Sequence, residues 1–171
     1  MAELLKPLVN SKLQLNNRLV LPPMATAKCE DDGKVTQEIL DYYDEKSKGG
    51  YISLIIIEHS FIEKQGKAHK GQLSIANDNL IEDLKKLSNI IHKNGSKAIM
   101  QINHAGSLAK SSVTGCEIVG PSAIMHPRNS ELPKELTKED IKVIISNFRN
   151  AARRVKNAGF DGVEIHSAHG Y

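Results

Sequence analysis

The stretch Ile52-Ser-Leu-Ile-Ile-Ile-Glu58 is a nearly continuous run of branched aliphatic residues that ends in a carboxylate. Strands that are buried on both faces of a parallel sheet have this composition, whereas a strand with one face in water alternates apolar and polar residues. We therefore expect a strand over 52–58 in the centre of a parallel sheet. The sequence on either side of it indicates how the sheet is built.

Before this strand, a short apolar run is followed by an amphipathic helical pattern. We expect a first strand over 18–24, preceded by a small N-terminal hairpin that includes Leu13 and Leu15. A helix should then begin at Thr36, whose hydroxyl can cap the first turn, and end at Gly49. Strand and helix in this order form one βα unit.

The same alternation continues after the central strand. The further elements that we expect are a helix capped by Asn77 or Asp78 and ended by Gly95, a strand over 97–102, a helix over 137–159 and a strand over 162–166. The helix over 137–159 starts with a capping box, Thr137 and Asp140, and its apolar stripe, which includes Ile141 and Ile145, should face the sheet. These units predict an α/β fold with parallel strands.

Composition and charge narrow the possible functions. The chain has 171 residues, of which 40% are hydrophobic, enough for the core of one domain. Lys and Arg number 23 and Asp and Glu 20, with no basic block, so we expect no nucleic-acid partner. The longest apolar run, Leu54–Ile57, is too short to cross a membrane. The distant Cys29 and Cys116 suggest neither a metal site nor a disulfide, and we expect a cytoplasmic protein.

Histidines gather where the expected strands end. Ligands of parallel α/β proteins bind at the carboxyl ends of the strands, and His104, His166, His169 and Tyr171 all follow such ends. Two histidines three positions apart can donate hydrogen bonds to one anionic oxygen, and a nearby phenol can give up a proton. The arrangement predicts a site that polarises a carbonyl group.

Two further strand ends carry unusual residues. Gln101 offers a donor and an acceptor, which matches the edge of a uracil-like ring. Pro22 and Pro23 lack the N–H groups of a regular strand, which suggests backbone exposed to a ligand. No glycine-rich phosphate-binding motif of the Rossmann or P-loop type occurs.

Several blocks together resemble the Old Yellow Enzyme family of FMN-dependent NAD(P)H oxidoreductases. They are Asn17-Arg-Leu-Val-Leu-Pro-Pro-Met24, Asp32-Gly-Lys-Val-Thr36, Gln101-Ile-Asn-His-Ala-Gly106, Gly120-Pro-Ser122 and Ala158-Gly-Phe-Asp-Gly-Val-Glu-Ile-His-Ser-Ala-His-Gly-Tyr171. The resemblance implies a (β/α)8 TIM barrel with FMN across its carboxyl-end mouth. Residues 1–171 would then be the N-terminal half of this FMN-binding domain, with a hairpin and about four βα units, truncated at its C-terminus.

The resemblance also implies roles for single residues. The backbone of Pro22, Pro23, Met24 and Ala25 would contact the isoalloxazine, Gln101 would pair with its pyrimidine edge, and His59 would lie beside it. His166 and His169 would hold the carbonyl oxygen of a small-molecule substrate, and Tyr171 would protonate its α-carbon. The implied enzyme is an ene-reductase resembling NADPH dehydrogenases, with hydride passing from NADH or NADPH through FMN to an activated alkene and no catalytic metal.

Three alternatives remain open at this stage. One is the N-terminal part of a longer iron–sulfur flavoenzyme of the 2,4-dienoyl-CoA reductase type, and another is a metal-dependent TIM-barrel hydrolase with His104, His166 and His169 as ligands. The third is a half-barrel that binds no ligand. In each case four parallel strands leave two open edges, so we expect the isolated chain to self-associate and to be a poor enzyme.

Overall fold

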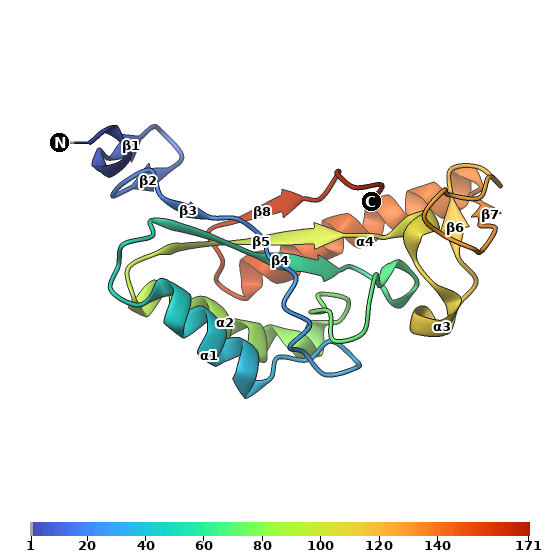
Figure 1. Ribbon diagram of the computed structural model, residues 1–171, viewed down its shortest axis with the longest axis horizontal. Coiled ribbons are helices and arrows are strands. Elements are labelled where there is room, and N and C mark those ends of the chain that lie inside the picture. Colours follow the sequence, from blue (N-terminus) through green and yellow to red (C-terminus); the bar gives the residue numbers. More distant parts are fainter. Residues whose placement is uncertain (1) are drawn as a thin grey trace.

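The computed structural model describes residues 2–171. Its centre is a parallel four-stranded sheet in the order β3-β4-β5-β8, and three helices cover one face of the sheet (Figure 1). These three helices are α1 (Gln37–Ser47), α2 (Ile81–Lys93) and α4 (Lys138–Asn157), and a fourth, short helix, α3 (Ser111–Thr114), lies in the connection between β5 and α4. The strands are β1 (Leu8–Val9), β2 (Gln14–Leu15), β3 (Val20–Leu21), β4 (Leu54–Phe61), β5 (Lys97–Asn103), β6 (Val119–Gly120), β7 (Lys134–Glu135) and β8 (Gly162–Ile165).

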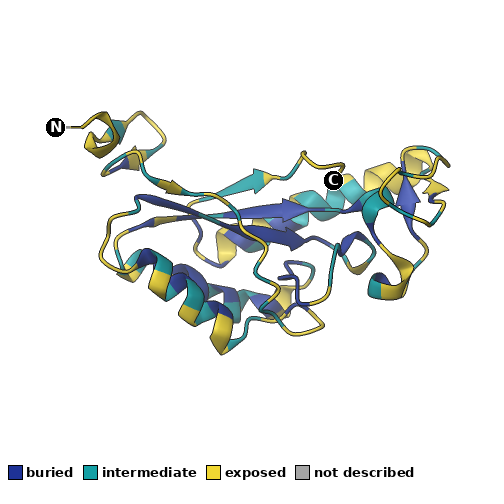
Figure 2. Cartoon of the chain, in the orientation of Figure 1, coloured by how far each residue is buried: buried dark blue, intermediate teal, exposed yellow. Residues whose placement is uncertain are grey.

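The core lies between the two inner strands and helices α1, α2 and α4. Ile55, Ile57 and Met100 of β4 and β5 are fully buried against Leu84 and Ile91 of α2. Figure 2 shows β4 and β5 as buried along most of their length, whereas β3 and β8 are partly exposed. The expected central position of the apolar strand is therefore confirmed.

The apolar strand is longer than the sequence predicts. We expected it to end at Glu58, but β4 continues to Phe61. Its pairing with β5 shifts register between Ile57 and Ser60, which is the mark of a β-bulge. Glu58 and His59 thus lie inside an irregular part of the strand and not beyond its end.

The first strand is shorter than expected. Over the expected 18–24, only Val20–Leu21 pair with β4, in parallel with Leu54 and Ile55. The strand stops there because Pro22 and Pro23 have no N–H to donate to a ladder. The expected N-terminal hairpin is present, and it is formed by β1 and β2, which pair antiparallel.

The predicted helix starts are right at two of three positions. Thr36 caps α1 by accepting a first-turn backbone N–H, and Thr137 with Asp140 forms a reciprocal capping box on α4. At the third position Asn77 makes no side-chain cap, and α2 follows a 3-10 turn over Asp78–Leu80. That turn takes up the residues that were expected to begin the helix.

The expected apolar stripe of α4 is buried only in part. Ala151 and Val155 are buried and Phe148 packs on the core, but Ile141 and Ile145 are 43% and 62% exposed. The N-terminal half of α4 lies beyond the carboxyl end of β8, beside the β6–β7 pair (Figure 1), and its Ile144 faces that pair across a pocket lined also by Val119 and Leu136. No helix within residues 2–171 is long and apolar enough to cross a membrane.

The long connection between β5 and α4 lies at the carboxyl end of the sheet, beside the C-terminus (Figure 1). It contains a 3-10 turn over Gly106–Leu108, the short helix α3 and the parallel pair β6 and β7. Asn129 anchors it by donating hydrogen bonds to the carbonyl oxygens of Ser107 and Ala109 at 2.8 Å. The connection is therefore structured, and it forms part of the face where ligands of such folds bind.

At the opposite end of the sheet, the carboxylate of Asp161 joins three elements. It accepts hydrogen bonds from the backbone N–H of Ala98 at 2.9 Å, from Nζ of Lys97 at 2.8 Å and from Nε2 of His92 at 2.7 Å. Burial alone would raise the pKa of Asp161, but these donors outweigh it and lower the pKa. Asp161 thus fastens the end of α2 and the turn before β8 to the start of β5.

We expect Asp161→Ala to lower the free energy of unfolding by about 2–3 kcal/mol, because it leaves a buried amide and a half-buried imidazole without acceptors. Urea unfolding at pH 7 measures this change, and Glu45→Ala, which removes a surface ion pair with Lys46, should change stability by less than about 0.5 kcal/mol. Since the pKa of Asp161 is lowered, its contribution is present above the ordinary aspartate pKa and is lost as the pH falls below it. Equal losses for the two variants would contradict the role of Asp161.

Candidate functional site

Four of the predicted site residues form one group of rings, which we call the imidazole cluster: His59, His166, His169 and Tyr171. The ring centroid of His166 lies 5.0 Å from that of Tyr171, 5.6 Å from His169 and 5.8 Å from His59. Tyr171 stacks on His59 at 5.7 Å with the ring planes 21° apart. The strand ends therefore bring these side chains together, as the parallel topology predicts.

A tight turn after β8 presents three members of the cluster. The backbone N–H of His166 donates to the carbonyl oxygen of Ile102 at 2.9 Å, which extends the pairing with β5 by one residue. His169 has a left-handed backbone with a φ of 60°, which is uncommon for a residue other than glycine. Arg128 of the long connection holds the turn by donating to the carbonyl oxygen of His169.

Two imidazoles of the cluster, those of His59 and His166, have lowered pKa values, which favours their neutral forms near pH 7. Burial, followed by the nearby His69, His166 and His169, lowers the pKa of His59 to about 4. Burial and then His169 also lower the pKa of His166. The backbone N–H of Ala168 donates to Nδ1 of His166 at 3.3 Å, so Nε2 carries the ring proton and can donate it to a hydrogen bond.

The phenol of Tyr171 keeps its proton at the same pH. Burial raises the pKa of Tyr171, and the opposing effect of Arg128 is smaller. The residue also packs on the small apolar cluster of Ala105, Ala109 and Ile118. The ring is thus fixed in place with a proton available for transfer.

Gln101 lies in β5, next to Glu164 of β8 in the parallel register. Its side chain is 7% exposed, and its Nε2 donates to Oε1 of Glu164 at 2.6 Å. This bond fixes the orientation of the amide group. The second amide hydrogen and the carbonyl oxygen remain for a ligand at the sheet face.

The residues after β3 form a loop that we call the proline segment, Pro22–Thr26. Met24 is 53% exposed. Within the described residues, the backbone N–H groups of Met24 and Ala25 make no hydrogen bond. The two amides are thus open to an acceptor from outside the chain.

Glu58 is a site residue whose role sequence reasoning missed. Its side chain is fully buried, and its Oε2 accepts the hydroxyl of Thr26 at 2.5 Å and the N–H of Thr26 at 3.3 Å. Burial raises the pKa of Glu58 to about 7, although the hydrogen bonds from Thr26 act in the opposite direction. The signal in the sequence was a single carboxylate at the end of an apolar run, which by itself indicates no role.

His104 does not join the imidazole cluster, contrary to the sequence prediction. Its Nε2 lies 3.4 Å from Oε1 of Glu63, and Glu63 has a lowered pKa chiefly because of His104. The chain turns sharply after β5, since the N–H of Ala105 donates to the carbonyl oxygen of Gly66 at 2.9 Å. That turn directs the ring toward the loop after β4. A different histidine, His69, lies beside the imidazole cluster: its ring is 5.3 Å from that of His59.

Residues 2–171 contain no group of three or more His, Cys, Asp or Glu side chains that could hold a metal ion. The hydrolase alternative needs His104, His166 and His169 as ligands of one metal ion. The structure separates them, because His104 lies beside Glu63 whereas His166 and His169 lie together in the imidazole cluster.

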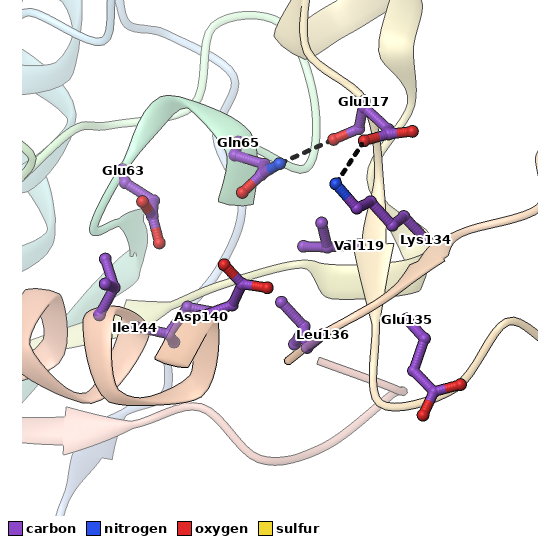
Figure 3. A pocket seen from close by; sticks show the side chains of 10 residues that line it. Glu63, Gln65, Glu117, Val119, Lys134, Glu135, Leu136, Asp140 and Ile144 are labelled. Atoms are coloured by element: carbon purple, nitrogen blue, oxygen red, sulfur yellow. Dashed lines mark hydrogen bonds and ion pairs between the residues drawn. The ribbon is translucent and has the colours of Figure 1, made fainter. Parts of the chain in front are cut away.

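A separate small pocket of about 150 Å³ lies between the loop after β4, the β6–β7 pair and the start of α4 (Figure 3). Gln65 donates to the carbonyl oxygen of Glu117 at 2.8 Å on one side of it, and Lys134 pairs with the Glu117 carboxylate at 3.6 Å. Its other charged lining residues, Glu63, Glu135 and Asp140, are all acidic. No residue of the imidazole cluster lines this pocket. The acidic lining of the pocket does not suit an anionic group.

Comparison with known proteins places these features in context. The chain is 39% identical to an NADPH dehydrogenase of Geobacillus sp. over 98% of its own length and 48% of the relative's. It is 40% identical to an NADH oxidase of Thermoanaerobacter brockii over 93% of its own length and 25% of the relative's. It thus spans half or less of the length of these relatives.

Solved structures show the same fold. An Old Yellow Enzyme from Pichia sp. AKU4542 superposes with a TM-score of 0.88 at 31% identity, over 99% of this chain and 47% of that one. Morphinone reductase in complex with tetrahydroNAD superposes with a TM-score of 0.88 at 26% identity, over 99% of this chain and 50% of that one. The four-stranded sheet and its helices correspond to about half of such a (β/α)8 barrel.

The family model of these enzymes matches residues 3–171. Its members are flavin oxidoreductases that use FMN, with NADH or NADPH as the hydride donor. The chain therefore belongs to the NADH:flavin oxidoreductase / NADH oxidase family, which includes the Old Yellow Enzymes.

Proposed function

We propose that the protein containing this chain is an ene-reductase, which uses NADH or NADPH to reduce the C=C bond of an α,β-unsaturated carbonyl compound. The observation that carries this proposal is the imidazole cluster, in which the rings of His166, His169 and Tyr171 meet at one end of the sheet, with the pKa of His166 lowered and that of Tyr171 raised. When bound, FMN supplies the hydride chemistry by accepting two electrons from the nicotinamide and delivering them to the alkene.

The residues at the strand ends fit a flavin. The Nε2 of His59 is buried and has no hydrogen-bond partner among the described residues, and the N–H groups of Met24 and Ala25 are open. A flavin ring is planar and has polar atoms along its edge, so it can use such groups. The residues that would hold it are the proline segment, His59 and Gln101.

His166 and His169 would bind the carbonyl oxygen of the substrate. The Nε2–H of His166 is free to donate, because Nδ1 already accepts from Ala168. Hydrogen bonds to that oxygen strengthen as negative charge develops on it, and they make the β-carbon more electrophilic. A neutral imidazole can serve as this donor without a change in net charge.

Tyr171 would supply the proton. Hydride addition at the β-carbon leaves the α-carbon as the nucleophilic end of an enolate, which must gain a proton to complete the reduction. The raised pKa of Tyr171 keeps the phenol protonated until the α-carbon takes the proton. The C=C bond thereby gains one hydride and one proton, which balances the reaction.

Longer relatives agree with this substrate class. One is named NADH:acrylate oxidoreductase, from Vibrio harveyi, and another NADH:fumarate oxidoreductase, from Klebsiella pneumoniae. Acrylate and fumarate are both alkenes conjugated to a carboxylate. This chain corresponds to 17% of each relative, so the agreement concerns the class of substrate alone.

We expect His166→Ala and His169→Ala to lower kcat for reduction of a cyclic enone by about 100–1,000-fold, the range for loss of an oxyanion-hole donor. The rate of flavin reduction by NAD(P)H should stay within about threefold, because that step does not use the carbonyl oxygen. Stopped-flow absorbance separates the two half-reactions.

His92→Gln is the matched control for this experiment, since His92 lies at the opposite end of the sheet and its loss should leave both half-reactions unchanged. If the alanine variants slowed both half-reactions equally, the assigned carbonyl-binding role would be wrong.

A second test concerns Gln101. We expect Gln101→Ala to raise the dissociation constant for FMN about tenfold, because it removes hydrogen bonds worth roughly 1.5 kcal/mol in total. Fluorescence titration of the apoprotein with FMN measures it. Gln65→Ala, which alters the pocket between β6–β7 and α4, is the control and should bind FMN like the parent. Equal affinity for Gln101→Ala and parent would remove Gln101 from the flavin site.

We also propose that the 171-residue chain, expressed by itself, self-associates and turns over poorly. Both edge strands have open ladders in the described chain, and Ile165 of β8 and Ile145 of α4 are more than 60% exposed, at 63% and 62%. Light scattering should report a dimer or larger species. A flavin-loaded monomer with full turnover would contradict this expectation.

A further inference from the structure

Thr26, the last residue of the proline segment, connects this segment to the inner strand β4. Its hydroxyl donates to Oε2 of Glu58 at 2.5 Å, and its backbone N–H approaches the same oxygen at 3.3 Å. The hydroxyl oxygen in turn accepts the N–H of Lys28 at 3.3 Å. One threonine side chain therefore sets the path of the backbone both at and after the segment.

The residue after Thr26 has a backbone that needs such support. Ala27 has a φ of 55°, in the left-handed region that residues other than glycine rarely occupy. Gly71 packs against it so closely that a Cβ on Gly71 would lie 2.5 Å from the carbonyl oxygen of Ala27. The N–H of Cys29 donates to the carbonyl oxygen of Gly71 at 3.0 Å. The loop is thus held by Glu58 on one side and by Gly71 on the other.

The backbone of Glu58 is itself held by a contact with helix α1. Its backbone N–H donates at 2.9 Å to the hydroxyl of Tyr43, a residue of α1 that is 1% exposed in the core. Oε1 of Glu58 is buried and has no hydrogen-bond partner among the described residues. A buried carboxyl group with one oxygen that accepts no hydrogen bond lowers the stability of the fold, and such groups in native structures call for an explanation beyond packing.

We propose that Glu58 is a positioning residue for the flavin: through Thr26, its buried carboxyl group holds the proline segment in the conformation that presents the N–H groups of Met24 and Ala25. This inference rests on the proposed function, because those N–H groups face a flavin only if the protein binds one. Glu58 touches neither flavin nor substrate in this arrangement. It acts through Thr26 alone.

The arrangement also gives a physical reason for the threonine at this position. The hydroxyl of Thr26 donates its only proton to Glu58, and its oxygen accepts from Lys28. It therefore has no proton left to donate to a flavin, and the residue that follows Met24 directly, Ala25, has no side-chain hydrogen-bonding group. The flavin would be contacted here by backbone groups, whose direction depends on the bond between Thr26 and Glu58.

The test compares Thr26→Val, which keeps the side-chain shape and removes the hydroxyl, with Thr26→Ser, which keeps the hydroxyl. We expect the valine variant to weaken FMN binding at least tenfold and to shift the visible flavin spectrum, and the serine variant to restore both. Glu58→Gln retains an acceptor and the side-chain shape, so it should lie between them. Thr114→Val, which removes a buried hydroxyl in the long connection, should match the parent.

Hydrogen exchange in the apoprotein gives a readout that does not need flavin. The N–H groups of Thr26 and Lys28 should exchange at least tenfold faster in Thr26→Val than in the parent and in Thr26→Ser, with the amides of α4 unchanged as a check on folding.

If the parent binds FMN and Thr26→Val matches Thr26→Ser in affinity, spectrum and exchange, the inference is overturned while the proposed function stands. If the parent binds no FMN, both fall. A valine variant that loses affinity but shows unchanged exchange at Thr26 and Lys28 also overturns the inference.

Discussion

Parallel pairing of β4 with β5, and of β5 with β8, is the constraint on which the rest of this structure depends. Strands joined by helical crossovers all run the same way, so their carboxyl ends meet at one edge of the sheet. Residues as distant in sequence as His59 and Tyr171 thereby come within stacking distance. The helices stabilise this order by burying the inner strands, and the site is a consequence of where the strands end.

Burial at that edge also decides the chemistry. A lone histidine in water would be partly charged near neutral pH, but the mutual proximity and burial of these rings favour the neutral forms of His59 and His166. The same burial favours the protonated phenol of Tyr171. Donors of hydrogen bonds without net charge suit an oxygen that becomes negative only during the reaction. This edge of the sheet thus presents oriented N–H and O–H groups, among them those of His166 and Tyr171.

Much of this could be predicted from the sequence, because periodicity and capping are local signals. The apolar run before Glu58 indicated an inner strand, Thr36 and Thr137 indicated helix starts, and the spacing of His166 and His169 indicated a paired site. The contact of His104 with Glu63 could not be predicted, since it depends on how two loops pack. The exposure of Ile145 was equally hidden, because periodicity shows which residues share a helix face and says nothing of what lies opposite.

The bulge in β4 adds one residue to the strand, which stays paired with β5 on either side of it. From Ile57 to Ser60 the strand advances three residues while β5 advances two, from Met100 to Ile102. In a regular strand neighbouring residues face opposite sides, so the sheet alone would dictate which of them reach the ligand. The additional residue lets Glu58 anchor a loop from within the core while His59 joins the ring cluster. Loss of one residue here would leave the ladder intact and force these two roles to compete for one position, so the length of the chain at this point is itself a requirement of the site.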